Sequence, residues 1–368
     1  MSQFIDNKYL VFIFLFVLGV LTSFSLPPYN FFFINFLTFP LLFYILVKRI
    51  NKNYINNFLN GWFYGFGFFL SNLYWISNSL KFDENFENLI IVSIILIPSL
   101  LSIFYGLFSL SLKFFNVGMN LGSILIFSLS LSIFEYLRGI LFGGFPWNLI
   151  SFSIVKMISS LQILSLIGTY SLNLLVITFF CLPILILFKI SKKKKITILF
   201  LATLILLFNS YYGYNKIQST EKIDKKSIFP SIKLVSPQFN IERFFVEEPI
   251  EKKMGELIEI SSPLNRDLLL IYPEGITNIG ELNNLKNDFS GTSKKLTNNT
   301  KIILGISFDD GEKIFNSLAL FNNQFKIEKK YYKNKLVPFG EFLPFEKFLS
   351  NFGLKKITHG YRSFSSSD

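Results

Sequence analysis

The first 212 residues of the chain contain seven long apolar segments, and this pattern restricts the fold more than any other feature of the sequence. Most of the segments approach the ~20 apolar residues that a helix needs to cross the hydrocarbon core of a bilayer. With 51% hydrophobic and 16% charged residues, the chain is too apolar for an ordinary soluble protein. The sequence therefore predicts a polytopic α-helical membrane bundle of about seven spans, with segments at residues 9–26, 31–47, 58–80, 88–112, 120–137, 161–188 and 196–212.

Basic residues in the loops predict the orientation of this bundle, because Lys and Arg concentrate in cytoplasmic loops. If the N-terminus is cytoplasmic, the cytoplasmic loops hold ten basic residues and the opposite loops hold three. The ten are Lys8, Lys48, Arg49, Lys52, Lys113, Lys189 and Lys192–Lys195, and the three are Lys81, Arg138 and Lys156. The net charge of +12 is therefore mainly a consequence of topology, and no nucleic acid is expected as a partner. With a cytoplasmic N-terminus, an odd number of membrane crossings places the C-terminal part of the chain outside the cytoplasm.

From about residue 214 the composition becomes that of a globular domain, with 23 basic and 19 acidic residues against 13 and 5 before it. Strands are expected at 231–236, 267–272, 301–308, 313–321 and 325–333, and helices at about 246–262 and 281–298. The first two strands are expected to be buried. This alternation predicts an α/β domain whose sheet is covered by helices. We therefore divide the chain into a transmembrane bundle, residues 1–213, and an extracytoplasmic α/β domain, residues 214–368.

Polar side chains in the second part lie at the ends and turns of the expected strands, where α/β folds place their sites. Residues 267–274 read DLLLIYPE, so Pro273 ends the strand and leaves Glu274 at its tip. Asn316 interrupts the strand expected at residues 313–321. Residues 331–341 read YYKNKLVPFGE, so Lys333 and Glu341 lie on either side of an apolar segment that ends in a glycine turn. Taken alone, Glu274 is also compatible with a helix cap or a surface charge, and residues 331–341 are compatible with an edge strand that carries surface charges and ends in a Pro-Gly turn.

The bundle contains three further candidates near the end of the fifth apolar segment. Glu135 and Arg138 lie one helical turn apart, just before the stretch Gly143–Asn148. An acid near the membrane boundary is a functional candidate, but an ion pair at this spacing can equally be structural, and both interpretations stay open. Trp147 suits a segment that lies in the headgroup layer of a lipid-handling protein, or a simple interfacial anchor.

The single cysteine and the single histidine restrict the chemistry further. Cys181 lies among Phe, Leu and Ile in the sixth apolar segment, so we interpret it as an unreactive core residue, and no intrachain disulfide is possible. His359 lies in a loop between polar and glycine neighbours, with no second histidine to accompany it. We therefore expect no metal site, no histidine-dependent triad and no cofactor.

Taken together, the strand ending in Pro-Glu, the Asn-Ser strand and the motif Y-x-K-x-x-L-V-P-F-G-E resemble the nitrilase superfamily. Together with the preceding apolar segments, the sequence LVPFGEFLP is similar to the apolipoprotein N-acyltransferase family of that superfamily. The resemblance covers nearly the whole chain. It implies a nitrilase-like αββα sandwich for the second domain. It also implies a catalytic glutamate, lysine and cysteine with an accessory glutamate nearby, and by position Glu274, Lys333 and Glu341 match all of these except the cysteine.

The implied reaction is transfer of an acyl chain from a membrane glycerophospholipid to the α-amino group of an N-terminal diacylglyceryl-cysteine, through a cysteine thioester. The implied partners are the phospholipid donor, the diacylglyceryl-apolipoprotein acceptor and the lipid bilayer. The implied location is the bacterial cytoplasmic (inner) membrane, with a cytoplasmic N-terminus and a periplasmic C-terminal domain. Asn316, Trp147 and Phe245 are weaker candidates for substrate binding, and Phe245 stands where the family has a tryptophan.

The chain departs from the family pattern at the nucleophile. The family cysteine lies beyond the FGE motif, the sequence ends at Asp368 before such a residue, and Cys181 lies within the membrane bundle. We therefore expect a C-terminally truncated chain with an incomplete sandwich. We predict that these 368 residues alone have no acyltransferase activity, and lipoprotein N-acylation by them, detected by mass spectrometry, would contradict this.

Two functions of other classes remain open at this stage. One is a membrane-tethered nitrilase-type amidase, which hydrolyses rather than transfers, and the stability of an acyl-enzyme toward water distinguishes the two. The other is a non-catalytic polytopic protein for binding or transport. This last function predicts that Glu274, Lys333 and Glu341 do not converge in space.

Overall fold

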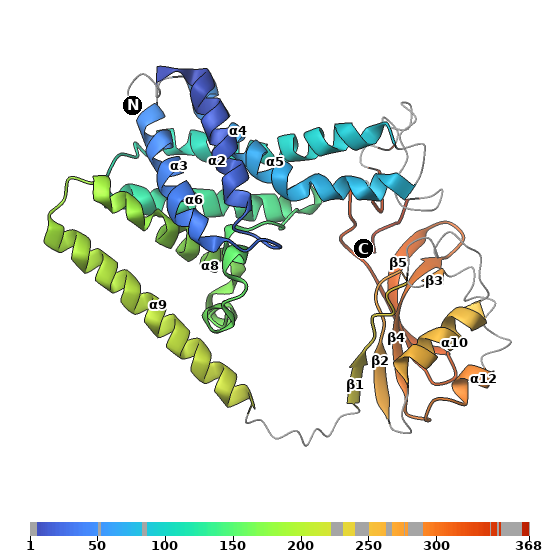
Figure 1. Ribbon diagram of the computed structural model, residues 1–368. Helices are drawn as coiled ribbons and strands as arrows, with labels where there is room; N and C mark the ends of the chain where they lie inside the picture. The colour runs from blue at the N-terminus through green and yellow to red at the C-terminus, as the bar shows by residue number, and fades with distance from the viewer. Residues whose placement is uncertain are drawn as a thin grey trace. The chain divides into compact units, whose positions relative to one another are not determined.

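The computed structural model describes most of the chain (Figure 1). The described residues are 6–50, 53–82, 87–221, 231–239, 250–262, 267–275, 277–278, 290–338, 340–343, 346 and 363–367. The chain separates into two compact units, Met1–Ile223 and Asp224–Asp368. Each unit is described by itself.

The first unit consists of helices, and each of the seven predicted apolar segments coincides with at least one of them (Figure 1). The α-helices are α2 (Lys8–Ser23), α3 (Asn35–Arg49), α4 (Tyr54–Leu73), α5 (Leu89–Phe114), α6 (Leu121–Ile140), α7 (Ile158–Leu161), α8 (Leu164–Cys181) and α9 (Lys192–Glu221). Short 3-10 helices, denoted η, lie between them: η1 (Phe32–Ile34), η2 (Tyr74–Phe82), η4 (Leu141–Gly143), η5 (Ile150–Ile154) and η6 (Leu182–Leu187).

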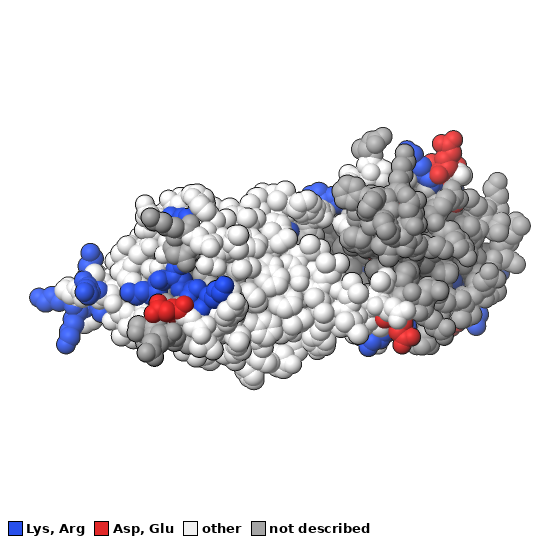
Figure 2. Space-filling view, turned by 90° about the horizontal axis from the view of Figure 1, so that it is seen from above, with Lys and Arg blue, Asp and Glu red and all other residues white. Residues whose placement is uncertain are grey.

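Among the described residues, five helical stretches are long and apolar enough to cross a membrane. They are Phe32–Arg49, Leu89–Phe114, Leu121–Gly143, Leu164–Leu187 and Lys192–Ser219. Helix α2 is apolar but has only 16 residues. In Figure 2, Lys and Arg gather toward one end of the helical unit, and a broad surface beyond them carries no charge, as expected of a surface that faces acyl chains. The total of seven crossings stays a prediction.

Glycines set the spacing between three of these helices. A Cβ atom on Gly61 of α4 would overlap the carbonyl oxygen of Tyr105 in α5, and one on Gly19 of α2 would overlap that of Tyr64 in α4. Small residues at such contacts let helix backbones approach closely, which drives helix association in a bilayer. The close packing also lets the buried Tyr64 hydroxyl donate to the Thr22 hydroxyl at 3.0 Å. These two glycines therefore hold α2, α4 and α5 together.

The second unit contains one mixed sheet in its described residues, with the strand order β1–β2–β4–β5–β6 and the short β3 beside β4. Strands β1, β2 and β4 are parallel, and β4, β5 and β6 are antiparallel. The strands are β1 (Ser231–Leu234), β2 (Leu268–Ile271), β3 (Thr277–Asn278), β4 (Lys301–Asp309), β5 (Ile314–Asn322) and β6 (Ile327–Tyr332). Figure 1 shows the helices α10 (Ile250–Ser261) and α12 (Ser290–Ser293) on one face of this sheet.

Helix α10 supplies the apolar cover of the sheet. Its buried Met254, Leu257 and Ile258 belong to one cluster with Leu270 of β2 and Ile302 of β4. The predicted combination of membrane helices with an α/β unit is therefore confirmed. The four-layer αββα arrangement stays a prediction.

Two details of the prediction for this unit are wrong. Strand β1 is not buried, since Ile232 and Leu234 are 64% and 76% exposed. Neighbouring residues of a strand point to opposite faces, and Lys233 donates to the Ser261 carbonyl of α10, so Ile232 and Leu234 lie on the face away from α10. The helix predicted over residues 281–298 ends at Ser293. Residues 294–300 form turns, and residues 279–289 lie outside the described part.

The glycine contact between α4 and α5 leads to a stability prediction. The substitution Gly61→Ala forces the two backbones apart, so we expect the chain in phospholipid nanodiscs to lose about 1–3 kcal/mol of stability and to unfold at a lower temperature. The matched control is Gly122→Ala in α6, where the nearest atom to the added Cβ is 3.5 Å away, so no loss is expected. Equal thermal unfolding of the two variants would contradict the packing described.

Candidate functional site

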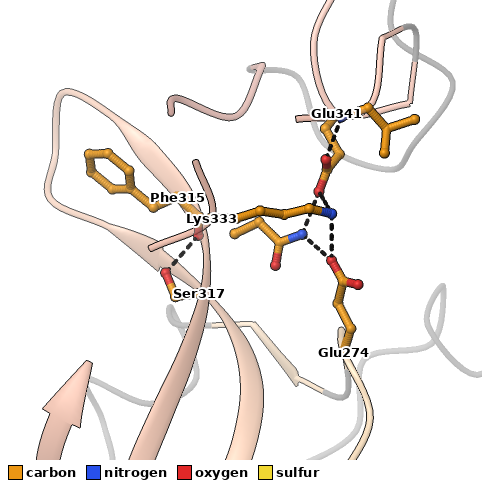
Figure 3. A network of polar contacts seen from close by, with 7 residues as sticks. Glu274, Phe315, Ser317, Lys333 and Glu341 are labelled. Carbon is orange, nitrogen blue, oxygen red and sulfur yellow. Dashed lines mark hydrogen bonds and ion pairs between the residues drawn. The ribbon is translucent and has the colours of Figure 1, made fainter. Parts of the chain in front are cut away.

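Four polar side chains of the α/β unit converge on one point (Figure 3). The Lys333 Nζ atom lies 3.1 Å from Glu274 Oε1 and 3.0 Å from Glu341 Oε1. The Asn316 Nδ2 atom donates hydrogen bonds to the same two oxygens. Two donors and two acceptors thus close a ring, which we call the Glu–Lys–Glu cluster and define as Glu274, Asn316, Lys333 and Glu341. The non-catalytic alternative predicted that the charged residues stay apart, and that prediction is wrong.

The β5–β6 ladder places two members of the cluster. Ser317 pairs with Tyr332 in the antiparallel register, so Asn316 and Lys333 are the next pair across the two strands. The Lys333 backbone N–H donates to the Asn316 carbonyl oxygen at 2.8 Å, which continues this pairing one residue beyond β6. Side chains directly opposite each other in an antiparallel pair are close neighbours. The register of the hairpin therefore fixes the asparagine beside the lysine.

Glu274 enters the cluster from the turn after β2. Tyr272 still donates to the Ile303 carbonyl at 3.0 Å, and the chain then leaves the sheet at Pro273. This turn lies against Gly305 of β4, where a Cβ atom would come within 2.5 Å of the Glu274 Cα. Only glycine at position 305 leaves room for the turn. Gly305 is the residue that the sequence analysis missed, although a glycine inside the strand sequence IILGISF signals a close backbone approach.

Glu341 is the anchored carboxylate of the pair. Its Oε2 atom accepts a hydrogen bond from the Val337 backbone N–H at 2.7 Å, and its own backbone N–H donates to the Val337 carbonyl at 2.8 Å. Its side chain is 9% exposed, whereas that of Glu274 is 62% exposed. The two glutamates that share one lysine are therefore not equivalent. The backbone holds the Glu341 carboxylate in place, and the Glu274 carboxylate is exposed to solvent.

Charges and hydrogen bonds set the protonation of the cluster. Burial favours the neutral form of Lys333, but hydrogen bonds to Glu341 and Glu274 and the charges of both outweigh it and raise the pKa of Lys333. Burial likewise favours neutral Glu274, but hydrogen bonds from Asn316 and Lys333 and the lysine charge hold the pKa of Glu274 below its ordinary value. The Lys333–Glu274 contact thus stabilises the fold above the ordinary pKa of glutamate, and this stabilisation is lost as the pH falls through the lowered pKa.

At neutral pH the cluster presents an ionised carboxylate beside an ammonium group. An exposed carboxylate can accept a proton from a nucleophile. An ammonium held nearby can stabilise an oxyanion that develops on a substrate carbonyl. In the part of the chain that the structure describes, no group of three or more His, Cys, Asp or Glu side chains is arranged to hold a metal ion.

The remaining residues singled out in the sequence lie elsewhere. Cys181 is fully buried in the apolar core of the helical unit, as predicted. Glu135 and Arg138 are buried in the same unit, with a closest N–O distance of 4.0 Å, and Trp147 is 49% exposed. Phe245 and His359 lie outside the described residues.

The five apolar helices and the attached α/β unit define the class of this chain, a multi-pass membrane protein with a globular unit. Residues 18–182 match the family model "Apolipoprotein N-acyltransferase N-terminal domain". This match supports the assignment of the chain to the apolipoprotein N-acyltransferase family, which the motifs in the sequence predicted.

Curated relatives agree with this assignment, and each of the following is named "Apolipoprotein N-acyltransferase". The relative from Agrobacterium fabrum is 26% identical over 359 residues, which cover 92% of this chain and 66% of that protein. The relative from Brucella melitensis is 26% identical over 364 residues, with 93% and 67% covered, and that from Rhizobium leguminosarum is 25% identical over 372 residues, with 94% and 68% covered. The chain thus spans about two thirds of the length of these relatives.

The cluster leads to a prediction about ionisation. The substitution Lys333→Met removes the hydrogen bond and the positive charge that lower the pKa of Glu274, so we expect that pKa to rise. A pH titration of 13C-labelled glutamate carboxyl groups by NMR, with Glu274 assigned through Glu274→Gln, measures the change.

Lys301→Met is the matched control for this titration. Lys301 is also a strand lysine that pairs with a glutamate, Glu328, but it takes no part in the cluster. This control variant is expected to leave the titration of Glu274 unchanged. An unaltered Glu274 titration in the Lys333 variant, or the same shift in both variants, would show that the lysine does not govern this carboxylate.

Proposed function

We propose that the Glu–Lys–Glu cluster belongs to the acyl-transfer site of a lipoprotein N-acyltransferase. The reaction would move an acyl chain from a membrane glycerophospholipid to the α-amino group of the N-terminal diacylglyceryl-cysteine of an apolipoprotein. The observation that carries the proposal is the position of the Lys333 ammonium between an exposed and an anchored carboxylate. The names of the relatives support acyl transfer to an apolipoprotein.

Glu274 acts as the general base in this proposal. It is the more exposed carboxylate, and its lowered pKa keeps it ionised at neutral pH. Its Oε atom takes the proton of a thiol, and the resulting thiolate attacks the carbonyl carbon of the phospholipid ester. When the tetrahedral intermediate collapses, the ester C–O bond breaks, and the departing alkoxide takes the proton back from Glu274. A thioester and a lysophospholipid result.

Lys333 stabilises the oxyanion of the tetrahedral intermediate, because its ammonium is held in place before the charge develops. Glu341 keeps Lys333 charged and oriented, since the Val337 N–H fixes its carboxylate. We assign Asn316 to the same positioning role, because its side-chain amide donates to both carboxylates. This role differs from the substrate contact expected for Asn316 from the sequence.

The second half of the reaction repeats this chemistry with an amine. The uncharged α-amino group of the acceptor attacks the thioester carbonyl and gives one proton to Glu274. The C–S bond breaks as the amide forms, and the released thiolate takes that proton back from Glu274. Both substrates are anchored in a bilayer, which accounts for the membrane helices of the chain. The family resemblance supports a location in the bacterial inner membrane. We propose a cytoplasmic N-terminus, because the loops on that side then hold most of the basic residues.

The thiol itself is proposed to come from outside these 368 residues. Cys181 is the only cysteine of the sequence, and it is fully buried in the apolar core of the helical unit, so it cannot meet a substrate there. Trp147 and Phe245 remain proposed contacts for substrate. Trp147 is half-exposed near the end of a membrane helix, and Phe245 rests on the family resemblance alone.

A chimera tests the proposal. The 368 residues are joined to the part of the Agrobacterium fabrum relative that follows the matched region, and lipoprotein N-acylation is measured by mass spectrometry with labelled phospholipid. We expect acylation by the chimera and none by the 368 residues alone. Glu274→Gln in the chimera is expected to lower the rate about 10²–10⁴-fold, and Lys333→Met about 10²–10³-fold.

The control for this assay is Glu328→Gln, which removes a surface carboxylate outside the cluster and is expected to leave the rate unchanged. Full acylation by the Glu274 variant, or activity of the 368 residues alone, would refute the proposal. Release of free fatty acid to water in place of transfer to the amine would favour the amidase.

A further inference from the structure

The helical unit contains a second polar network, which the proposed acyl-transfer chemistry does not use. Glu135 of α6 is fully buried, and its two carboxylate oxygens accept hydrogen bonds from the Tyr105 hydroxyl of α5 at 2.8 Å and from the Asn173 amide of α8. Arg138 is 1% exposed, and its closest approach to Glu135 is 4.0 Å. The glutamate thus balances the arginine charge while its own hydrogen bonds tie three helices together.

The hydrogen bonds of Arg138 go to the loop after α6. Its Nη1 atom donates to the carbonyl oxygens of Phe145 and of Trp147, the latter at 2.8 Å, and its own carbonyl accepts from the Phe145 N–H at 2.8 Å. The loop reverses direction through the positive φ angles of Gly143 and Gly144, 89° and 81°. Residues 144–149 lie in no helix or strand. The guanidinium therefore binds two carbonyl groups of a segment that lies outside helices and strands.

This loop carries one half of an aromatic pair. The Trp147 ring stacks on that of Trp75 in η2, with ring centroids 5.2 Å apart and an angle of 19° between the planes. The two rings are 49% and 42% exposed, and nearby Phe142 is 89% exposed. Trp147 lies four residues after the membrane stretch Leu121–Gly143. The end of a span lies at the boundary between acyl chains and headgroups, the depth that tryptophan prefers.

We propose that Arg138 is a positioning residue that holds Trp147 stacked on Trp75, and that the paired rings contact phospholipid at the headgroup–acyl boundary. A lysine does not reproduce this contact, because its Nζ atom lies one bond nearer to the backbone than the Arg138 Nη1 atom, which donates to both carbonyls. The choice of a phospholipid as ligand rests on the proposed function. The positioning of the loop does not depend on it.

Circular dichroism tests the positioning in the full chain reconstituted in phospholipid nanodiscs. The chain has three tryptophans, and Trp62 stacks on Phe66, so the pair of Trp75 and Trp147 is the source expected for an exciton couplet between indole rings. In a Trp62→Phe background, Arg138→Lys is expected to abolish the couplet, as Trp75→Phe does. A couplet of full amplitude in the Arg138 variant overturns the proposal.

Tyr105→Phe is the matched control for this measurement. It removes one hydrogen bond from Glu135, and thus weakens the same network, but it does not touch the loop. We expect a lower unfolding temperature and an unchanged couplet. Loss of the couplet in the Tyr105 variant as well would show that the stacking of the two indole rings depends on the stability of the helical unit in general. That result would overturn the positioning role proposed for Arg138.

Brominated phospholipids test the contact with lipid. In the Trp62→Phe background, bromines near the headgroup end of the acyl chain are expected to quench tryptophan fluorescence more than bromines near the terminal methyl. Arg138→Lys is expected to remove this depth dependence. Absence of quenching, or stronger quenching by deep bromines, overturns the lipid contact. None of these measurements involves Glu274 or Lys333, so their outcome is independent of the acyl-transfer assay.

Discussion

The contact of one ammonium group with two carboxylates is the interaction on which the site of the α/β unit depends. Lys333 lies 3.1 Å and 3.0 Å from oxygens of Glu274 and Glu341, and Asn316 binds the same oxygens from the neighbouring strand. Burial favours the neutral form of Glu274, but the hydrogen bond from Asn316 and the hydrogen bond and charge of Lys333 outweigh it and lower the pKa of Glu274. The lysine therefore allows Glu274 to stay ionised, and an ionised base is what the proposed thiol chemistry requires.

The two units of the chain solve the problem of a buried charge in different ways. In the α/β unit the opposite charges contact each other directly, and the Glu274 carboxylate remains exposed. In the helical unit Glu135 and Arg138 are 4.0 Å apart, and each makes its hydrogen bonds to other groups. A charge inside a membrane bundle is costly unless an opposite charge neutralises it. The direct contact in the α/β unit suits proton transfer, and the arrangement in the helical unit suits the positioning of the loop after α6.

The sequence predicted the charged members of the cluster because each lies in a local motif, DLLLIYPE or YYKNKLVPFGE. It did not predict the roles of Asn316 and Gly305, since these depend on contacts between strands distant in sequence. Gly305 matters only because the turn at Glu274 crosses β4 at that residue. The exposure of Ile232 and Leu234 was missed for a related reason, because an apolar strand pattern does not reveal which face a helix covers. The length of the apolar segments predicted the membrane helices, since it is a local property of the sequence.

Hydrogen exchange at the Val337 amide tests most directly whether the cluster acts as one unit, because this N–H donates to Glu341. Its opening free energy is measured in the full chain with Lys333→Met, with Asn316→Ala and with both. If the ring of contacts is cooperative, the losses are not additive, with a coupling of about 0.5–3 kcal/mol. Losses that add within error would show that the lysine and the asparagine act independently, and would contradict this account of the site.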